Sequence, residues 1–245
     1  MTDTALLPDP DIGIRPPGFL APWREVLTPL DWMRLARDWR GLPKGRARRP
    51  RTVVLVPGFG ASPLSLSFLS RALKRAGHTP ANWGLGRNTG EVAELLPRLI
   101  DQVEAAAERA DEQVVLVGWS LGGYLAREAA RDRPELVNRV ITLGSPVIGG
   151  PSYTRVAPLY EARGYDLAEI RQLVCERYEV PLEVPVFAIY SKRDGIVSWR
   201  ACIDEWSPDV RHLEVGATHL SMGTSPEVLT AVLDELEPSP VAPEH

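Results

Sequence analysis

The stretch VVLVGWSLGGYLAREA, residues 114–129, joins an apolar run, a serine between two glycines and a helical pattern within sixteen residues. The run at 114–117 is typical of a strand that is buried on both faces. The residues after Gly122 favour a helix, so a sharp turn must connect the two elements. The stretch therefore predicts a strand, a tight corner and a helix, with one hydroxyl directed outward from the corner.

The corner has the spelling G-x-S-x-G, running from Gly118 through Ser120 to Gly122. In so sharp a turn, side chains on either side of the serine would collide, and glycines remove them. The serine would then stand above the carboxyl edge of a sheet, at the N-terminus of a helix whose N–H groups point to the same space. The alternative is a plain serine cap between a strand and a helix.

Short β-branched runs alternate with longer amphipathic segments from residue 52 onward. The runs expected to form strands lie at 52–59, 79–84, 113–119, 137–145, 184–194 and 210–216. The segments expected to form helices lie at 62–77, 89–110, 120–132 and 225–237. This alternation predicts an α/β fold: a mostly parallel sheet of about six or more strands with helices on both faces.

The expected domain organisation is an N-terminal arm with a docking helix, residues 1–50, followed by the main domain, residues 51–245. Helical patterns without a convincing strand at 147–183 predict a small helical cap inserted into that domain. Proline-rich composition at 1–18 and at 237–245 predicts irregular structure at both ends of the sequence.

Three of the seven tryptophans, Trp23, Trp32 and Trp39, fall in the N-terminal segment. Trp32 and Trp39 recur at helical spacing, and we interpret the three rings as an aromatic stripe that docks a helix on the domain. Two alternatives remain open: a flap over a substrate site, and a weak contact of this helix with a membrane or a partner.

Composition narrows the possible functions. The formal net charge of −4 over 245 residues is too mild for a protein that neutralises phosphates, so no nucleic-acid partner is expected. The basic residues at 44–51 are interpreted as solvated charges that flank a hydrophobic strand. No apolar run reaches the roughly 18 residues of a membrane span. Because the N-terminus also lacks the pattern of a secretion signal, we expect no transmembrane segment and a cytoplasmic location.

Motifs for cofactors and metals are missing from the sequence. G-x-G-x-x-G does not follow any expected strand, H-E-x-x-H does not occur, and Cys175 and Cys202 are not spaced as metal or redox pairs. The glycines of GLGRNTG, residues 84–90, lack the lysine of a phosphate loop and are expected to form at most a turn that lines a pocket. Neither a cofactor nor a metal is therefore expected.

With its strand, serine corner and helix in this order, the sequence resembles the α/β-hydrolase superfamily over residues 52–236, in particular its compact bacterial lipase- and esterase-like members. The resemblance implies a serine nucleophile, then an acidic residue, then a histidine in chain order. Asp194 ends the strand run at 184–194, and His219 lies in a loop before the last helix. The resemblance thus implies a catalytic triad of Ser120, Asp194 and His219.

Two N–H donors are also needed to stabilise the oxyanion of an acyl-transfer reaction. One is expected from Leu121, which follows the serine. By resemblance to lipases with a His-Gly-x segment, the other is expected from Phe59 in the loop PGFGAS, residues 57–62. This sequence has Pro57 in the histidine position, so the resemblance does not say how the loop is held. The alternative is a glycine loop that only turns the chain.

A serine, a base, an orienting acid and oxyanion donors together indicate acyl transfer through a covalent acyl-enzyme. The residues expected to line an apolar pocket are Phe59, Trp119, Leu121, Ile148, Val197 and Trp199. We therefore expect hydrolysis of small-molecule carboxylic esters with apolar acyl or alcohol groups. The alternatives are an acyltransferase or C–C bond hydrolase on the same triad, a lipase acting at an interface, and a non-catalytic binding protein.

Overall fold

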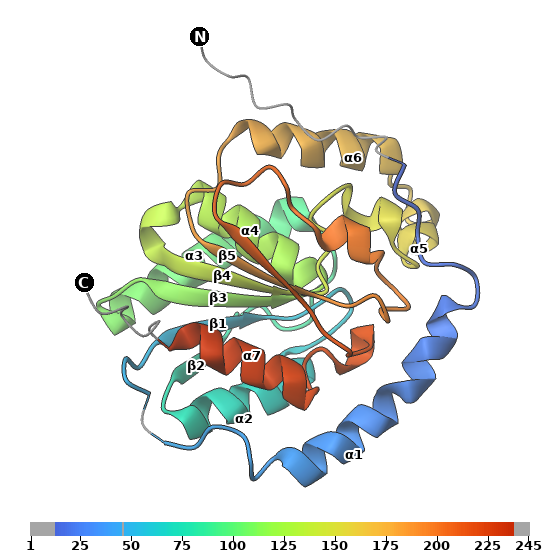
Figure 1. The fold of residues 1–245 in the computed structure, drawn as a ribbon. Coiled ribbons are helices and arrows are strands. Elements are labelled where there is room, and N and C mark those ends of the chain that lie inside the picture. Colours follow the sequence, from blue (N-terminus) through green and yellow to red (C-terminus); the bar gives the residue numbers. More distant parts are fainter. Residues whose placement is uncertain (1–12, 46, 238–245) are drawn as a thin grey trace, which may run out of the picture.

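A six-stranded parallel sheet forms the centre of the molecule (Figure 1). The computed structural model describes residues 13–45 and 47–237, so the expectations for residues 1–12 and 238–245 lie outside the described residues. The strands are β1 (Thr52–Val56), β2 (Thr79–Asn82), β3 (Val114–Trp119), β4 (Val137–Leu143), β5 (Val186–Tyr190) and β6 (Val210–Glu214). Their order across the sheet is β2-β1-β3-β4-β5-β6, and each pair of neighbours is parallel. The predicted fold class is confirmed.

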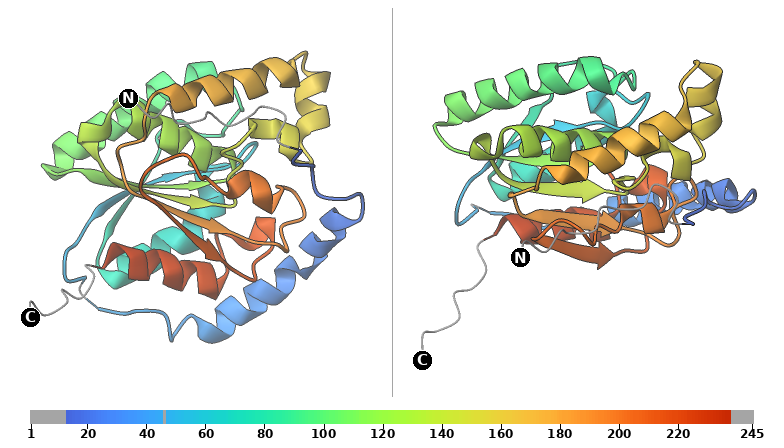
Figure 2. Two further views of the ribbon diagram at one scale, coloured as in Figure 1. Left: turned by 45° about the horizontal axis from the view of Figure 1, so that its top comes forward. Right: turned by 90° about the horizontal axis from the view of Figure 1, so that it is seen from above.

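Helices cover both faces of the sheet (Figure 2). The helices of the main layers are α2 (Ser67–Ala76), α3 (Val92–Ala110), α4 (Leu121–Asp132) and α7 (Pro226–Leu236). Helices α2 and α7 pack with one set of strand side chains, and α3 and α4 pack with the other set. Because successive strand side chains point to opposite faces, both sets must be apolar, which explains the continuous apolar runs in the sequence.

The segment at 147–183 contains short helices and, among its described residues, no strand of the sheet. These helices are η4 (Gly150–Tyr153), α5 (Ala157–Ala162), α6 (Leu167–Glu176) and η5 (Arg177–Glu179). Arg177 fastens the segment to α4 through hydrogen bonds to the carboxylates of Glu128 and Asp132. A single bridge pairs Thr154 with Val197 in the loop after β5. The segment therefore contacts both α4 and the loop that follows β5.

The N-terminal segment forms η1 (Ala21–Leu27) and α1 (Thr28–Asp38), which lie beside the sheet (Figure 1). The predicted aromatic stripe is wrong, because Trp23 and Trp32 are 71% and 55% exposed. Only Trp39 of the three packs on the domain, edge-on to the Phe68 ring. The buried line along α1 is instead Thr28, Asp31 and Leu35, and Trp32 lies next to that line rather than on it.

Candidate active site

Ser120 occupies a strained corner between β3 and α4. Its backbone has φ 55° and ψ −125°, a combination that is costly for a residue with a side chain and persists only where the surroundings impose it. The N–H of Ser120 donates to the carbonyl oxygen of Leu143 at the end of β4 (2.8 Å). The serine is thus fixed at the carboxyl edge of the sheet, one residue before the first turn of α4.

The glycines on either side of Ser120 are required by close backbone packing. A Cβ on Gly118 would lie 2.3 Å from the carbonyl oxygen of Gly122, and a Cβ on Gly122 would lie 2.2 Å from that of Val56. Both distances are far below contact, and the groups in the way are backbone atoms that cannot rotate aside. The G-x-S-x-G spelling therefore reflects the approach of α4 to the end of β1 as well as the turn itself.

Asp194 and His219 are brought together from two loops at the same edge of the sheet. Asp194 follows β5, and His219 begins the short helix η7 (His219–Ser221) after β6. Asp194 Oδ2 and His219 Nδ1 are 2.6 Å apart, and the two residues are 5% and 3% exposed. The other carboxylate oxygen, Oδ1, accepts the N–H groups of Ile196 and Val197. Backbone N–H groups therefore hold one oxygen of the Asp194 carboxylate, and the other oxygen binds the imidazole.

The pKa of His219 is raised above its usual value of 6.5. Burial of the ring lowers it, but the charge of Asp194, its hydrogen bond to the ring and the charge of Glu25 outweigh that effect. Because Nδ1 is bonded to the carboxylate, the other nitrogen, Nε2, is left to exchange a proton with a neighbour.

Trp119, the residue before Ser120, contacts His219. The Trp119 and His219 rings have centroids 5.5 Å apart, and Trp119 Nε1 donates to the His219 carbonyl oxygen (3.1 Å). Within the described part of the chain, no hydrogen bond joins Ser120 Oγ to the imidazole. The structure thus brings Asp194 and His219 into direct contact and places Ser120 beside them without that bond.

The loop at 57–62 lies against Ser120, and a buried asparagine holds it. A Cβ on Gly58 would lie 3.2 Å from the Cβ of Ser120. Asn88, which is 0% exposed, donates from its side-chain amide to the Pro57 carbonyl (2.8 Å), and its backbone carbonyl accepts the N–H of Gly60. Asn88 belongs to GLGRNTG, residues 84–90, a segment that was expected to form at most a turn that lines a pocket. It supplies the anchoring that the sequence resemblance left unspecified.

Phe59 belongs to this loop, and Leu121 directly follows Ser120. Leu121 is the first residue of α4, a position whose N–H has no partner within the helix. Among the described residues, neither N–H donates to a backbone or side-chain acceptor. Both N–H groups are thus available, as a pair of oxyanion donors would have to be.

The remaining residues expected to line a pocket are spread over different surroundings. Val197 and Trp199 line a cavity of about 430 Å³ beside Asp194, between the loop after β5 and the N-terminal segment. Trp199 stacks on Tyr190 (5.9 Å between ring centroids). Ile148 is 2% exposed and packs in a small cluster with Tyr153 and Ala201. Ser120 and Phe59 are not among the residues that line the 430 Å³ cavity.

Sequence reasoning missed Glu25, which contacts both loops of the site. Its carboxylate accepts the N–H groups of Gly195 (2.9 Å), His219 (3.1 Å) and Leu220 (2.9 Å). No local pattern could have identified Glu25, because it lies about 170 residues from Asp194. The interpretation of the N-terminal segment was based on its tryptophans. The contact exists only once the chain has folded.

A parallel sheet covered by helices on both faces, with a strained serine after β3 and an acid–imidazole pair at the same edge, defines an α/β-hydrolase fold. A model of the alpha/beta hydrolase family matches residues 53–241. The chain belongs to this family.

Curated relatives match part of the chain. A pimeloyl-[acyl-carrier protein] methyl ester esterase from Aeromonas hydrophila is 34% identical over 108 residues, which are 44% of this chain and 32% of that protein. A protein of the same name from Salmonella heidelberg is 39% identical over 62 residues, 25% of this chain and 23% of that protein. The matches therefore span about a third and about a quarter of these relatives.

Solved structures match over most of the chain. A lipase from Bacillus licheniformis, BlEst2, has a TM-score of 0.59 at 16% identity and covers 78% of this chain and 95% of its own. A structure described with the metagenome-derived lipolytic enzymes LipS and LipT has a TM-score of 0.59 at 18% identity, covering 80% and 95%. At this level of identity the likeness shows the fold alone. The family match and the curated relatives support a hydrolase.

Proposed function

We propose that the protein hydrolyses small-molecule carboxylic esters with apolar acyl or alcohol groups through a covalent acyl-enzyme. The observation that carries the proposal is the 2.6 Å contact between buried Asp194 and His219, at the sheet edge where Ser120 is held in its strained corner. The names of the curated relatives, which are methyl ester esterases, support the same reaction class.

In the proposed mechanism, Ser120 Oγ attacks the ester carbonyl carbon while His219 Nε2 accepts the hydroxyl proton. The carboxylate of Asp194 keeps Nδ1 protonated and stabilises the imidazolium. The oxyanion is bound by the N–H groups of Leu121 and Phe59. His219 then returns the proton to the departing alcohol, and water repeats the sequence on the acyl-enzyme to release the acid and free Ser120.

The segment at 147–183 is proposed to act as a cap over this site. Its Tyr160 ring lies 5.3 Å from the Phe59 ring, and the Arg163 guanidinium lies 5.1 Å from the centroid of the same ring. The cap thus contacts the side chain of a proposed oxyanion residue. Variation in this segment would change which acyl groups fit.

Hydrolysis of p-nitrophenyl butyrate by the purified protein tests the reaction. Ser120→Ala should abolish it, because the nucleophilic oxygen is gone while the glycines that shape the corner remain. Ser145→Ala is the matched control, since Ser145 is a buried serine whose hydroxyl donates to Leu143. An unchanged rate in Ser120→Ala would refute the proposal. A fluorophosphonate probe that labels wild type and not Ser120→Ala would identify the nucleophile directly.

Among the alternatives, action on lipid esters at an interface is favoured by one observation. Phe19, Trp23 and Met33 in the N-terminal segment are 82%, 71% and 61% exposed. The test is a comparison of rates below and above the solubility limit of a longer-chain ester. A rise in rate above that limit would favour a lipase, and simple saturation would favour an esterase.

A further inference from the structure

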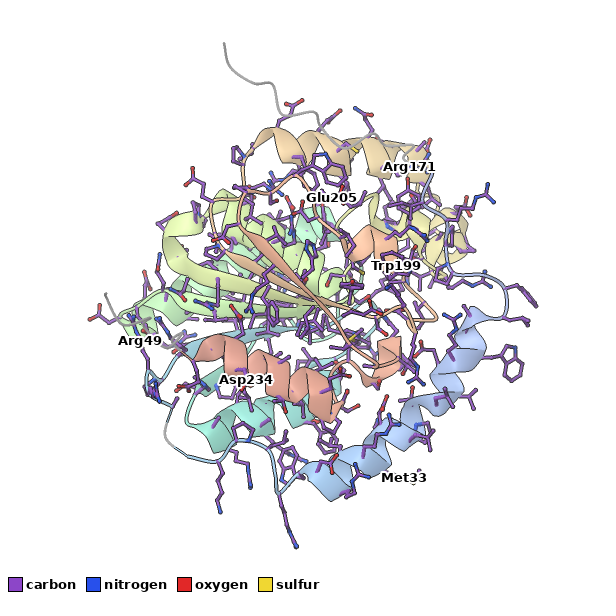
Figure 3. All side chains as sticks on the ribbon, viewed as in Figure 1. Met33, Arg49, Arg171, Trp199, Glu205 and Asp234 are labelled. Atoms are coloured by element: carbon purple, nitrogen blue, oxygen red, sulfur yellow. The ribbon has the colours of Figure 1, made fainter. Side chains whose placement is uncertain are left out.

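The N-terminal helices carry an unusual share of the exposed apolar surface. Of the fourteen large apolar side chains that are exposed among the described residues, eight fall within residues 19–33. We call these eight the outer apolar face: Phe19, Leu20, Trp23, Val26, Leu27, Leu30, Trp32 and Met33. Phe19 and Leu20 come just before η1, and the other six lie on η1 and α1, most of them with another member three or four residues away. Figure 3 shows Met33 on the outer side of α1. A stripe of this kind marks an interaction surface.

The opposite side of the same helices is polar and faces the domain. Glu25 accepts three backbone N–H groups from the loops of Asp194 and His219. Thr28 Oγ1 lies 2.9 Å from Thr218 Oγ1, and Asp31 is 5% exposed. The usual orientation of a surface helix, apolar inward and polar outward, is therefore reversed over this stretch. Polar contacts fix the helix to the domain and leave the apolar side for another partner.

Charge distinguishes this segment from the rest of the chain. Residues 13–45 contain six arginine or lysine side chains and three acidic ones, a formal charge of +3, whereas the whole chain carries −4. Two of the three acids, Glu25 and Asp31, are engaged on the inner side. Arg24, Arg40 and Lys44 are exposed. A negatively charged surface would attract this segment and repel the remainder of the molecule, which gives a single favoured orientation.

We propose that the outer apolar face binds the surface of an anionic lipid bilayer. Exposed Trp, Phe and Leu side chains with neighbouring arginines are the composition of helices that lie in the plane of a lipid interface. Since Glu25 and Thr28 contact the loop of His219, a bilayer bound here lies next to the sheet edge that carries Ser120. Such binding goes beyond ester hydrolysis and would bring the site to substrates dissolved in the lipid.

Binding to lipid vesicles tests the proposal with the full chain. Flotation is compared for vesicles of phosphatidylcholine alone and vesicles in which about a third of the lipid is phosphatidylglycerol, with a preference of about tenfold or more expected for the anionic set. Trp23→Ser combined with Met33→Gln should reduce binding to the anionic vesicles by about tenfold or more. Leu64→Ser is the matched control, because Leu64 is 80% exposed outside the outer apolar face. It should leave binding unchanged.

Three outcomes would overturn the lipid proposal. The wild-type chain could fail to float with either kind of vesicle. Leu64→Ser could weaken binding as much as the double variant does. The chain could form a dimer in sedimentation experiments that the double variant dissociates, in which case a second copy covers the face. Because the side chains of Trp23, Met33 and Leu64 are exposed, we expect both variants to melt close to the wild-type temperature. That measurement checks that the variants are folded.

A separate observation concerns Glu25 and the geometry of the site. The Glu25 carboxylate accepts hydrogen bonds from the N–H of Gly195, which is next to Asp194, and from the N–H groups of His219 and Leu220. It therefore ties together the two loops whose side chains meet at 2.6 Å. A Cβ on Gly195 would lie 2.4 Å from the Ala21 carbonyl, so η1 is packed directly on this loop. Glu25 also lies outside residues 53–241, the part that matches the family.

We infer that Glu25 is a positioning residue for the Asp194–His219 pair, an inference that rests on the proposed function. Three N–H bonds to a charged acceptor are strong and directional, so they fix the spacing of the two loops. A displacement of about 1 Å in such a pair costs up to about 100-fold in rate. The negative charge acts in addition by favouring the imidazolium of His219.

Glu25→Gln tests both effects, since the side chain keeps its size but loses its charge and directs an amide N–H toward a backbone N–H. We expect kcat/KM to fall by about tenfold or more. The midpoint of His219 ring titration, followed by NMR, should shift to lower pH. Thr28→Val is the matched control: it removes the 2.9 Å contact between Thr28 and Thr218 from the same helix without a change in charge. It should leave the midpoint in place.

The ring titration needs no enzymatic activity, so it separates this inference from the proposed function. If Ser120→Ala keeps full activity while Glu25→Gln lowers the titration midpoint, the mechanism is wrong and the contact of Glu25 with the pair stands. An unchanged midpoint in Glu25→Gln, or an equal shift in Thr28→Val, would overturn the inference about Glu25.

Discussion

A buried ion pair anchors α4, the helix that follows Ser120. Arg127 and Asp204 have side-chain exposures of 1% and 0%, and the Arg127 Nη2 group donates to Asp204 Oδ2. Asp204 Oδ1 also accepts the N–H groups of Trp206 and Ser207. The pair joins the middle of α4 to the loop before β6.

Asp204→Asn keeps the shape of the side chain and an oxygen for the two N–H groups, but it removes the charge that compensates Arg127. The remaining acceptor for that guanidinium group is Ser207 Oγ at 3.2 Å. Leaving one member of a buried pair uncompensated costs about 3–5 kcal/mol. At roughly 2–4 °C per kcal/mol for a chain of this size, the melting temperature should fall by about 6–20 °C.

The assay is denaturant or thermal unfolding of wild type, Asp204→Asn, Arg127→Met and the double variant at neutral pH. Each single variant leaves a buried charge without its partner, whereas the double variant leaves none and should lie within about 1–2 kcal/mol of wild type. A loss below about 1 kcal/mol in Asp204→Asn would refute the reasoning. A double variant as unstable as the two singles combined would refute it equally.

The pH dependence of that difference has a definite sign. Burial raises the pKa of Asp204, but the charge of Arg127 and hydrogen bonds from Ser207 and Trp206 outweigh it, so the pKa is lowered. A lowered folded-state pKa contributes stability above the ordinary carboxyl pKa and loses it as the pH falls through the folded value. The gap between wild type and Asp204→Asn should therefore be constant near neutral pH and shrink in strong acid.

Three further predictions follow from the site. Asp194→Asn should lower kcat by roughly 10⁴-fold in steady-state assays while the protein stays folded, because the amide favours the wrong imidazole tautomer. The acid limb of the kcat/KM profile should lie above the ordinary histidine value of 6.5, since the neutral imidazole forms only as the pH rises through the raised pKa of His219; a limb below that value would contradict the cited interactions. Gly122→Ala should lower the melting temperature sharply or prevent folding, because its Cβ would lie 2.2 Å from the Val56 carbonyl oxygen, whereas Gly18→Ala, with open space around the added methyl group, should be nearly neutral.

The sheet and its helices could be predicted from the sequence because their signals are local. Each strand is a short apolar run, and each main helix repeats its apolar residues every three or four positions. The parallel arrangement of the strands also followed, since strands that alternate with helices along the chain are usually joined by right-handed crossover connections. Asp194 and His219 could be proposed as the acid and the histidine because Asp194 ends one strand run and His219 follows another, at the positions that the resemblance to α/β hydrolases implies.

The sequence could not predict in this way the roles of Asn88 and Glu25, or the exposure of Trp23 and Trp32. Asn88 holds the loop after β1 from 31 residues away, and Glu25 reaches the His219 loop from 194 residues away. The spacing of tryptophans along a helix shows that they share a side, but it does not show whether that side faces the domain or solvent. Here Thr28 and Asp31 face the domain together with Leu35, and Trp23 and Trp32 were left outside.

The reversed orientation of the N-terminal helices follows from the hydrogen-bond acceptors that the loops of Asp194 and His219 require. The N–H of Gly195 lies in the loop after β5, and those of His219 and Leu220 lie at the start of η7, so no strand or helix supplies their acceptors. An apolar helix face packed there would leave these donors without partners, at a cost of about 1–3 kcal/mol each. A carboxylate satisfies all three at once, so the helix gains more by docking its polar side on the loops. Its apolar side must then face outward, which makes the lipid-binding proposal and the positioning role of Glu25 two consequences of one docking geometry.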